Sequence, residues 1–291
     1  MSFSKVVDTA IFTASLLNSS QRMPLSGTYS GATLSTVTAL ANPLRGTLLW
    51  DECIYTITGV TVAGGATGGS YTITLETDAV MGYTALPIAS VILGPNHVNG
   101  AAIIMDNNHH CPGSPLPTHV QMTQGSTGLC SFTINAVAKQ YRGTLGTAGN
   151  RTSERVLQGS LLGNPGPGAG TITTITTDTT FVLGRTDTDI GMGKMRLWDN
   201  AFFWAVGNSA TTGTWDVDIV GRVGGATTTL ARTGTAGTIT ALWDKKPLIN
   251  QFYGCMVNPT HVIVTEVSAG TIAGLEVVGI AKGGRGTQAK R

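Results

Sequence analysis

The sequence predicts an all-β protein made of two tandem, homologous antiparallel β-sandwich domains of jelly-roll-like type. Composition gives the first indication, because the 291 residues include 39 glycines and 45 threonines while charged residues make up only 12%. Threonine is β-branched and suits a pleated, half-buried surface, and glycine supplies the positive φ angles of tight turns. An internal repeat and short stretches of period-two alternation give the other two indications.

The repeat covers most of the chain. The tract PTHVQMT at 117–123 recurs as PTHVIVT at 259–265, and INAVAKQYRGT at 134–144 recurs as VVGIAKGGRGT at 277–287. Weaker matches precede them: LWD at 49–51 and 197–199, SYTITL at 70–75 with TWDVDI at 214–219, and SLLN at 15–18 with SLLG at 160–163. Ordered matches whose offset drifts only between about 142 and 148 residues indicate a duplicated unit. We therefore expect one sandwich at 1–145 and a second at 146–291, each with about eight strands.

Alternation places strands in both repeats. Apolar and polar residues alternate at 71–75 and at 215–219, which is typical of a strand with one buried face. The last strands, at 132–136 and 275–279, are expected to follow the same rule with the same face inward. One stretch near the start also fits a helical face, formed by Val7, Ala10, Ile11, Ala14 and Leu17.

The threonine-rich segment 170–184 has low sequence complexity but is expected to form a strand rather than to be disordered. It carries apolar side chains that a strand would bury, namely Ile172, Ile175, Phe181, Val182 and Leu183. Glycine-rich stretches such as 63–69 and 163–170 are expected to be turns.

Charge and cysteine usage exclude several classes. A formal net charge of +2 with scattered basic residues does not favour a dedicated nucleic-acid binder. No apolar run has the length of a signal peptide or of a membrane span, so neither secretion nor membrane insertion is expected. The cysteines show no CxxC spacing and are expected to be small buried residues; they are Cys53, Cys111, Cys130 and Cys255.

A zinc site was considered in the first repeat, because imidazole, thiolate and carboxylate groups gather there. The residues are His97, Asp106, His109, His110, Cys111 and His119. Adjacent residues of a strand point to opposite faces, so we interpret 106–115 as an exposed loop and predict no metal site. His119 and His261 occupy the same place in both repeats, which favours packing or hydrogen bonding at the start of a strand.

Catalytic patterns are lacking. The sequence has no GxSxG turn and no glycine-rich run followed by GK[ST]. Asp178, Asp187 and Asp189 do not have the spacing of an EF-hand loop and are interpreted as loop residues. We therefore predict a protein that is not an enzyme, with no catalytic residue, no bound cofactor and no metal.

The tryptophans offer one route to ligand binding, because exposed aromatic side chains on a β-sandwich can stack on sugar rings. Trp50, Trp198 and Trp215 fall on positions shared by both repeats and are expected in the core. Trp204 and Trp243 remain as candidates for carbohydrate binding. The tail at 282–291 carries basic residues separated by glycine and is expected to be solvated or to contact an anionic partner.

The series TGTWDVDI at 212–219, TLARTGTAG and NPTHVIVTEVSAGTIAGLEVVGIAK at 258–282 resembles β-sandwich virion proteins of tailed bacteriophages. This resemblance implies a capsid decoration or cement protein that stabilises a phage head lattice, assembles in the host cytoplasm and ends in the virion. Its implied partners are itself, with a trimer favoured, and the major capsid protein or other virion proteins. Two alternatives remain open: a double jelly-roll capsid protein, and a tail-associated carbohydrate-binding or receptor-binding module.

Overall fold

The computed structural model of this chain describes twenty stretches of the sequence, and the statements below concern these residues. They are 6–17, 19–25, 36–39, 49–50, 52–63, 69–78, 80, 82–94, 102–105, 114–126, 128–139, 156–162, 174–183, 197–207, 212–223, 226–233, 245–250, 256–257, 259–272 and 274–283. All of their regular structure is β-strand, and every described strand pair is antiparallel. The predicted all-β class is confirmed. This part of the chain holds no helix with the length and hydropathy needed to cross a membrane.

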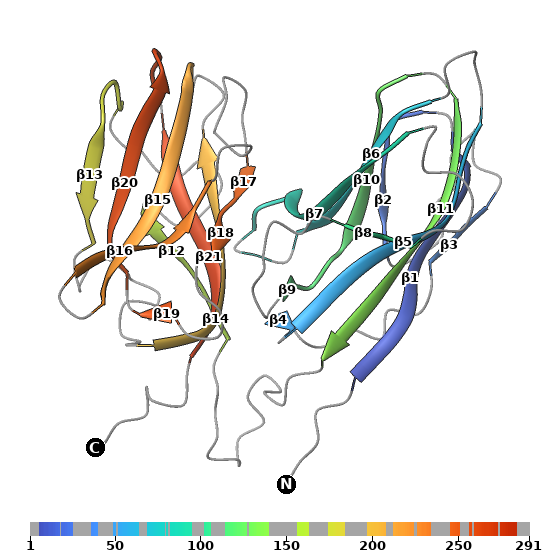
Figure 1. Cartoon of the computed structure of the whole chain (residues 1–291), viewed down its shortest axis with the longest axis horizontal. Helices are drawn as coiled ribbons and strands as arrows, with labels where there is room; N and C mark the ends of the chain where they lie inside the picture. Colours follow the sequence, from blue (N-terminus) through green and yellow to red (C-terminus); the bar gives the residue numbers. More distant parts are fainter. Residues whose placement is uncertain are drawn as a thin grey trace, which may run out of the picture. The chain divides into compact units, whose positions relative to one another are not determined.

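The chain divides into two compact units. Unit 1 comprises Met1–Ala79, Pro87–Asn107 and Leu116–Arg142, and unit 2 comprises Val80–Leu86, Asn108–Pro115 and Gly143–Arg291. Each unit contains two antiparallel sheets (Figure 1).

In unit 1 the first sheet, called the β1 sheet, has the order β3 (Thr36–Ala39), β1 (Val6–Leu17), β11 (Leu129–Lys139), β5 (Glu52–Ala63), β8 (Ile103–Ile104). The second, the β2 sheet, has the order β2 (Gln21–Pro24), β10 (His119–Gln124), β6 (Tyr71–Thr77), β7 (Leu86–Leu93). The short strand β4 (Leu49–Trp50) lies outside these sheets, and so does β9 (Ser114–Pro115), whose residues belong to unit 2.

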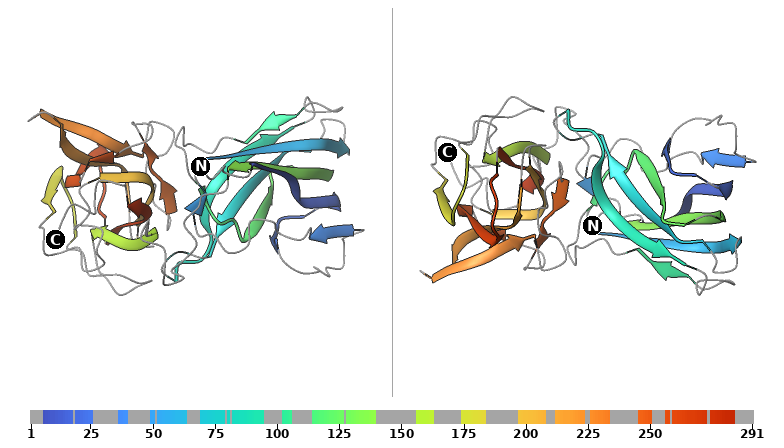
Figure 2. Two further views of the ribbon diagram at one scale, coloured as in Figure 1. Left: turned by 90° about the horizontal axis from the view of Figure 1, so that it is seen from below. Right: turned by 90° about the horizontal axis from the view of Figure 1, so that it is seen from above.

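In unit 2 the β12 sheet has the order β12 (Val156–Leu162), β21 (Leu275–Gly283), β14 (Leu197–Gly207), β17 (Lys245–Pro247), and β19 (Met256–Val257) also pairs with β14. The β13 sheet has the order β13 (Thr179–Val182), β20 (Pro259–Ser268), β15 (Thr214–Val223), β16 (Ala226–Arg232), β18 (Ile249–Asn250). The strands of this unit surround its interior in the views of Figure 2.

Both units follow the same path. In unit 1 the first main strand pairs with the last (β1 with β11), the second with the next to last (β2 with β10), and β5 with β8, while β6 lies beside β7. In unit 2 the corresponding pairs are β12 with β21, β13 with β20, β14 with β17, and β15 with β16. Nested antiparallel pairs divided between two facing sheets are the connectivity of a jelly roll.

The tracts that match in sequence also match in register. Val120 of β10 lies opposite Leu75 of β6, and Val262 of β20 lies opposite Ile219 of β15. The predicted alternation in these strands is confirmed, since the inward side chains are buried in both units: Tyr71, Ile73, Leu75, Trp215, Val217 and Ile219.

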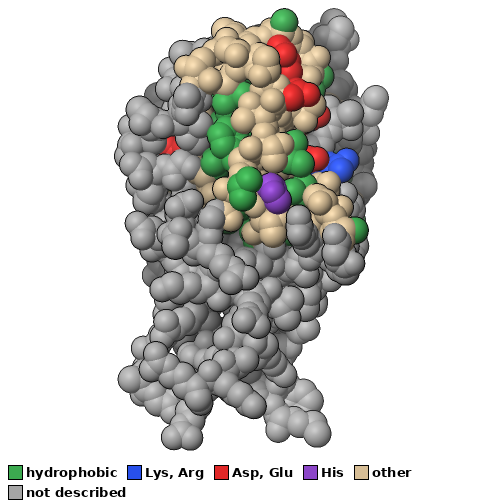
Figure 3. Space-filling model, turned by 90° about the vertical axis from the view of Figure 1, so that its left-hand side faces the viewer, with side chains coloured by type: hydrophobic (Ala, Val, Ile, Leu, Met, Phe, Trp, Pro, Cys, Tyr) green, Lys and Arg blue, Asp and Glu red, His purple; other side chains and the backbone are tan. Residues whose placement is uncertain are grey.

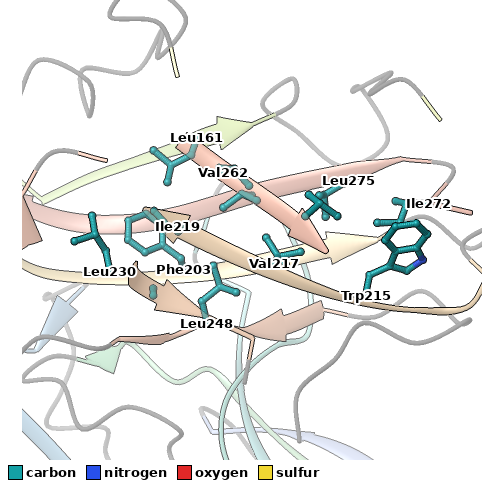
Figure 4. Close-up of a cluster of buried hydrophobic side chains, with 14 of the residues drawn as sticks. Leu161, Phe203, Trp215, Val217, Ile219, Leu230, Leu248, Val262, Ile272 and Leu275 are labelled. Carbon is teal, nitrogen blue, oxygen red and sulfur yellow. The ribbon is translucent and has the colours of Figure 1, made fainter. Parts of the chain in front are cut away.

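The interior of unit 2 is an apolar cluster between its two sheets (Figure 4). The β13 sheet contributes Trp215, Val217 and Val262, and the β12 sheet contributes Phe203 and Leu275, all of them fully buried. Trp215 also satisfies its indole N–H, because Nε1 donates to the carbonyl oxygen of Thr212 at 2.9 Å. Burying such a large side chain with its polar atom paired stabilises the fold without a desolvation penalty.

The segment near the start is strand β1, so the helical face considered for it is wrong. The pairing of β1 with β11 shifts register between Ala10 and Phe12, and Ile11 and Phe12 are both buried. A β-bulge of this kind places two consecutive side chains inward and breaks period two. This spacing is why the apolar residues also fitted a helix.

Two expectations about burial need correction. In β21 both faces are buried, since Leu275 and Val277 point into the cluster while Val278 and Ile280, on the other face, are equally inaccessible. In β13, Phe181 and Leu183 pack against the cluster as expected, but Val182 is 72% exposed because it lies on the opposite face of an edge strand. Ile172 lies outside the described residues, and Ile175 is buried.

Candidate functional site

The densest group of charged side chains among the described residues lies on the outer face of the β2 sheet. Its members are Arg22 from β2, Glu76 from the end of β6, Asp78, which directly follows β6, and His119 from β10. In each strand the adjacent residue is apolar and buried, as Met23, Leu75 and Val120 illustrate. Because side chains alternate between the faces of a strand, burial of these neighbours places the charged residues outside.

Arg22 joins the two acidic residues. Its Nε donates to Oε2 of Glu76 at 2.7 Å, and its terminal nitrogen donates to Oδ1 of Asp78 at 2.5 Å. Burial lowers the pKa of Arg22, but its hydrogen bonds and charge interactions with Glu76 and Asp78 oppose this effect, and the pKa is raised overall. The guanidinium group therefore stays charged and links β2 to β6 across β10.

His119 completes the group through Nδ1, which lies 2.9 Å from the hydroxyl of Thr118 and 3.3 Å from Oδ2 of Asp78. The backbone N–H of Asp78 donates to the same hydroxyl at 2.9 Å. Burial and the charge of Arg22 lower the pKa of His119, and the attraction of Asp78 and Glu76 only partly opposes them. The lowered pKa favours the neutral imidazole, which weakens the charge attraction across the 3.3 Å contact with Asp78.

In unit 2 the histidine is present as His261, but the positions of Glu76 and Arg22 hold uncharged residues. The Thr260 hydroxyl lies 2.8 Å from Nδ1 of His261, and it donates to the carbonyl oxygen of Val220 at 3.4 Å, as the Thr118 hydroxyl does to that of Glu76 at 3.5 Å. By register, the place of Glu76 is taken by Val220 and that of Arg22 by Thr180. The part that both units share is thus a hydrogen bond at the start of a strand, the role expected for these histidines.

The charged group is a structural clamp by its chemistry. Both carboxylates accept hydrogen bonds from Arg22, which joins the three side chains into one group. No set of at least three His, Cys, Asp or Glu side chains within the described ranges is arranged to hold a metal ion.

Most residues of the considered zinc site lie outside the described residues, namely His97, Asp106, His109, His110 and Cys111. His119 is the exception and belongs to the clamp. Of the aspartates considered for cation binding, Asp187 and Asp189 are also outside the description. Asp178 accepts a hydrogen bond from the backbone N–H of Glu266 at 2.8 Å, which fixes the approach to β13.

Trp204 cannot be the exposed aromatic side chain considered for carbohydrate stacking. It is fully buried, and its ring centroid lies 4.5 Å from that of Phe202. Trp243 lies outside the described residues, as do the side chains of Trp50 and Trp198. Trp215 and its counterpart Tyr71 are buried, which confirms the core position expected for this pair.

Cys53 and Cys130 are buried free cysteines, as predicted. Burial raises the pKa of each thiol to about 12, and for Cys53 a hydrogen bond with Tyr55 opposes the rise. Thiols of this kind are poor nucleophiles and poor metal ligands at neutral pH. Cys111 and Cys255 lie outside the described residues.

The clamp was not predicted from the sequence. Its signal was a difference between the repeats, since Glu76 and Asp78 continue the polar face of β6 where the second repeat has Val220 and Arg222. In the first repeat the acidic Glu76 lies opposite the shared histidine, where the second repeat has Val220. A nearly buried carboxylate needs a partner of opposite charge. Only the strand order shows that Arg22, more than fifty residues away, supplies it.

No family model matches the chain, and no curated protein is similar to it. Among solved structures it is similar to PNGF-II (11% identity, TM-score 0.34), covering 96% of this chain and 65% of that one. It is also similar to XepA, an exported protein of PBSX (12%, TM-score 0.24, covering 95% and 86%). A third structure is the STIV MCP, a viral major capsid protein (10%, TM-score 0.30, covering 96% of each chain). At these identities and scores the similarities do not assign a function.

Proposed function

We propose that this protein is a non-enzymatic structural component of a virus particle, a decoration protein that binds the head lattice of a tailed phage and stabilises it. The observation that carries the proposal is the repetition of one jelly-roll path in both units. We attribute this repetition to duplication of an ancestral unit. The repeated sequence tracts, which pair in the same register in both units, support this origin.

Tandem units of one topology suit a symmetric lattice. A trimer of such a chain presents six similar units, which fits a hexagonal or quasi-hexagonal platform. The proposed partners are therefore further copies of the chain and the major capsid protein, and the proposed location is the virion.

The outer face of the β1 sheet suits close contact between proteins. Thr13 and Thr133 share a hydrogen bond of 3.2 Å across β1 and β11, and Asn135 donates to the hydroxyl of Thr58 at 2.8 Å across β11 and β5. Neutral hydroxyl and amide groups can be brought against a partner without the cost of desolvating charges. Ile54 and Val137, which lie opposite each other on this face, add exposed apolar area.

The same jelly-roll path also favours a second candidate, a double jelly-roll capsid protein that builds the shell itself. The two candidates differ in what the purified protein does alone. A decoration protein stays a small soluble oligomer until heads are added, whereas a shell protein assembles into sheets or closed particles.

Light scattering across a concentration series, followed by electron microscopy and sedimentation with purified heads, tests these candidates. A discrete oligomer that sediments only with heads supports decoration. Spontaneous particles support the shell protein. A monomer that binds neither heads nor itself would overturn both.

The third class, a carbohydrate-binding module, now depends on Trp243 because Trp204 is buried. A glycan-array signal that is lost in Trp243→Ala and kept in Trp204→Phe would support it. The absence of any binding signal from the wild-type protein across the array would count against a carbohydrate-binding module.

A further inference from the structure

Among the residues that the structure describes, the edge of the β13 sheet in unit 2 is open along β13. This strand pairs with β20 on one side, and no described strand pairs with its other side. It forms the outer border of the sheet in Figure 1. On the adjoining face, shown in Figure 3, exposed apolar side chains lie around a histidine. Val182 lies opposite His261 and contributes to this exposed apolar area.

One hydrogen bond shows which backbone groups of β13 face outward. The N–H of Leu183 donates to the carbonyl oxygen of Thr260 at 2.9 Å, so at this position the backbone faces β20. In an antiparallel strand the N–H and C=O of alternate residues point to opposite sides. The backbone groups of Thr180 and Val182 therefore point to the open edge, where a further strand can pair with them.

The corresponding edge in unit 1 is blocked. Leu25 donates to Thr118 at 2.8 Å as Leu183 does to Thr260, so Arg22 and Pro24 face the open side of β2. Pro24 lies opposite His119 as Val182 lies opposite His261. Proline has no N–H to offer, and Arg22 adds a charge, two devices that protect sheet edges from pairing. In β13 the equivalent positions are Val182 and Thr180, which retain their backbone N–H groups and carry no charge.

The sequence of β13 is complementary to itself in an antiparallel arrangement. With Phe181 of two copies opposite each other, Thr180 of one lies opposite Val182 of the other, and both have outward-facing backbone groups. Phe181 and Leu183, which are only partly buried now, would be covered further. The nearest charge, Asp178, would lie beyond the paired residues in each copy, so no like charges face each other.

We propose that two copies of this chain associate through β13, edge to edge and antiparallel about Phe181, so that their β13 sheets form one continuous sheet. The contact is isologous, and its main chain hydrogen bonds come from Thr180 and Val182. It goes beyond the proposed function, because a two-fold contact cannot form the three-fold trimer considered there and is a separate contact between copies. It rests on that function only in requiring two copies to meet, and not on binding to a head.

The first test variant gives β13 the proline that unit 1 has at the equivalent position, Pro24. Val182→Pro removes the outward N–H while leaving the hydrogen bond of Leu183 to Thr260 intact, and Val182→Thr is the matched control that keeps the N–H. Sedimentation velocity across a concentration series should show a dimer for wild type and Val182→Thr, with a dimer dissociation constant at least about 100-fold higher in Val182→Pro. Thr180→Lys, which charges the edge and keeps its N–H, should weaken the dimer as well.

Hydrogen exchange keeps the proposal testable if Val182→Pro does not fold. In the wild-type protein the amides of Thr180 and Val182 should become protected as concentration rises, while that of Leu183 is protected throughout. A wild-type monomer at every concentration, or a dimer unchanged in both Val182→Pro and Thr180→Lys, overturns the proposal. Head binding by a monomer would overturn this contact while leaving the decoration role standing.

Discussion

Gly279 of β21 lies opposite Phe203 of β14, and the phenyl ring occupies the space where a side chain would begin. A Cβ at this position would overlap Cδ1 of Phe203, would lie 2.6 Å from its Cε1, and would lie 2.9 Å from the carbonyl oxygen of Phe202. In unit 1 the corresponding pair is Ala136 and Tyr55, where the methyl group is accommodated and buried. Glycine is thus required in unit 2 by the ring opposite it.

Gly279→Ala should destabilise the protein by about 1–3 kcal/mol, because neither the ring nor the backbone can move aside freely. Denaturant unfolding measures the change. In a double-mutant cycle, Phe203→Leu should reduce the cost of the alanine by more than about 0.5 kcal/mol. Additive effects of the two substitutions would contradict the steric explanation.

Arg22→Gln should lower the free energy of unfolding by about 1–2 kcal/mol, because it leaves the nearly buried carboxylate of Glu76 without its cationic partner. Thr180→Ala, at the corresponding exposed place in unit 2, is the control and should change stability by less than about 0.5 kcal/mol. Equal effects of the two substitutions would show that the clamp does not hold β2.

Stability should fall on acidification through the titration of His119. Its pKa is lowered in the folded state, so the unfolded state binds the proton more tightly, and the loss begins as the pH drops below about 6.5, the usual pKa of histidine. Urea midpoints at pH 7.5 and pH 5 should therefore differ less in His119→Gln than in wild type. An identical pH dependence would exclude His119 as the titrating group.

Cys53 and Cys130 should not react with a thiol reagent at pH 8 while the protein is folded, because burial holds the pKa of each near 12. The measurement is made in Cys111→Ser/Cys255→Ser, so that only these two thiols remain. Both should react once the protein is unfolded in guanidinium chloride. Rapid labelling in the folded state would show that one of them is accessible.

The alternation of Trp215, Val217 and Ile219 made their strand and its buried face predictable, because period two is a local property of the chain. Strand β1 was harder, since its bulge at Ala10 and Phe12 replaces period two with a spacing shared by helices. The burial of Val278 on the second face of β21 and the exposure of Val182 on β13 depend on what covers each sheet and on where a strand lies within it. Neither can be read from a single strand.

The contacts of the clamp also could not be predicted from local sequence patterns. His119 stood out in the sequence because it recurs as His261, but its partners did not. Arg22 meets Glu76 only because β2 and β6 lie on either side of β10. Such an arrangement follows from strand order, which alternation and turn signals leave open.

The nested pairing described for each unit also brings together the two ends of its chain path. Val6 lies opposite Lys139 across β1 and β11, and Val156 lies opposite Lys282 across β12 and β21. A path of this kind leaves its first and last strands side by side, so its two ends lie close together. Such a unit can be circularly permuted by a short linker between its first and last strands. Each unit is in this sense a module whose ends already meet.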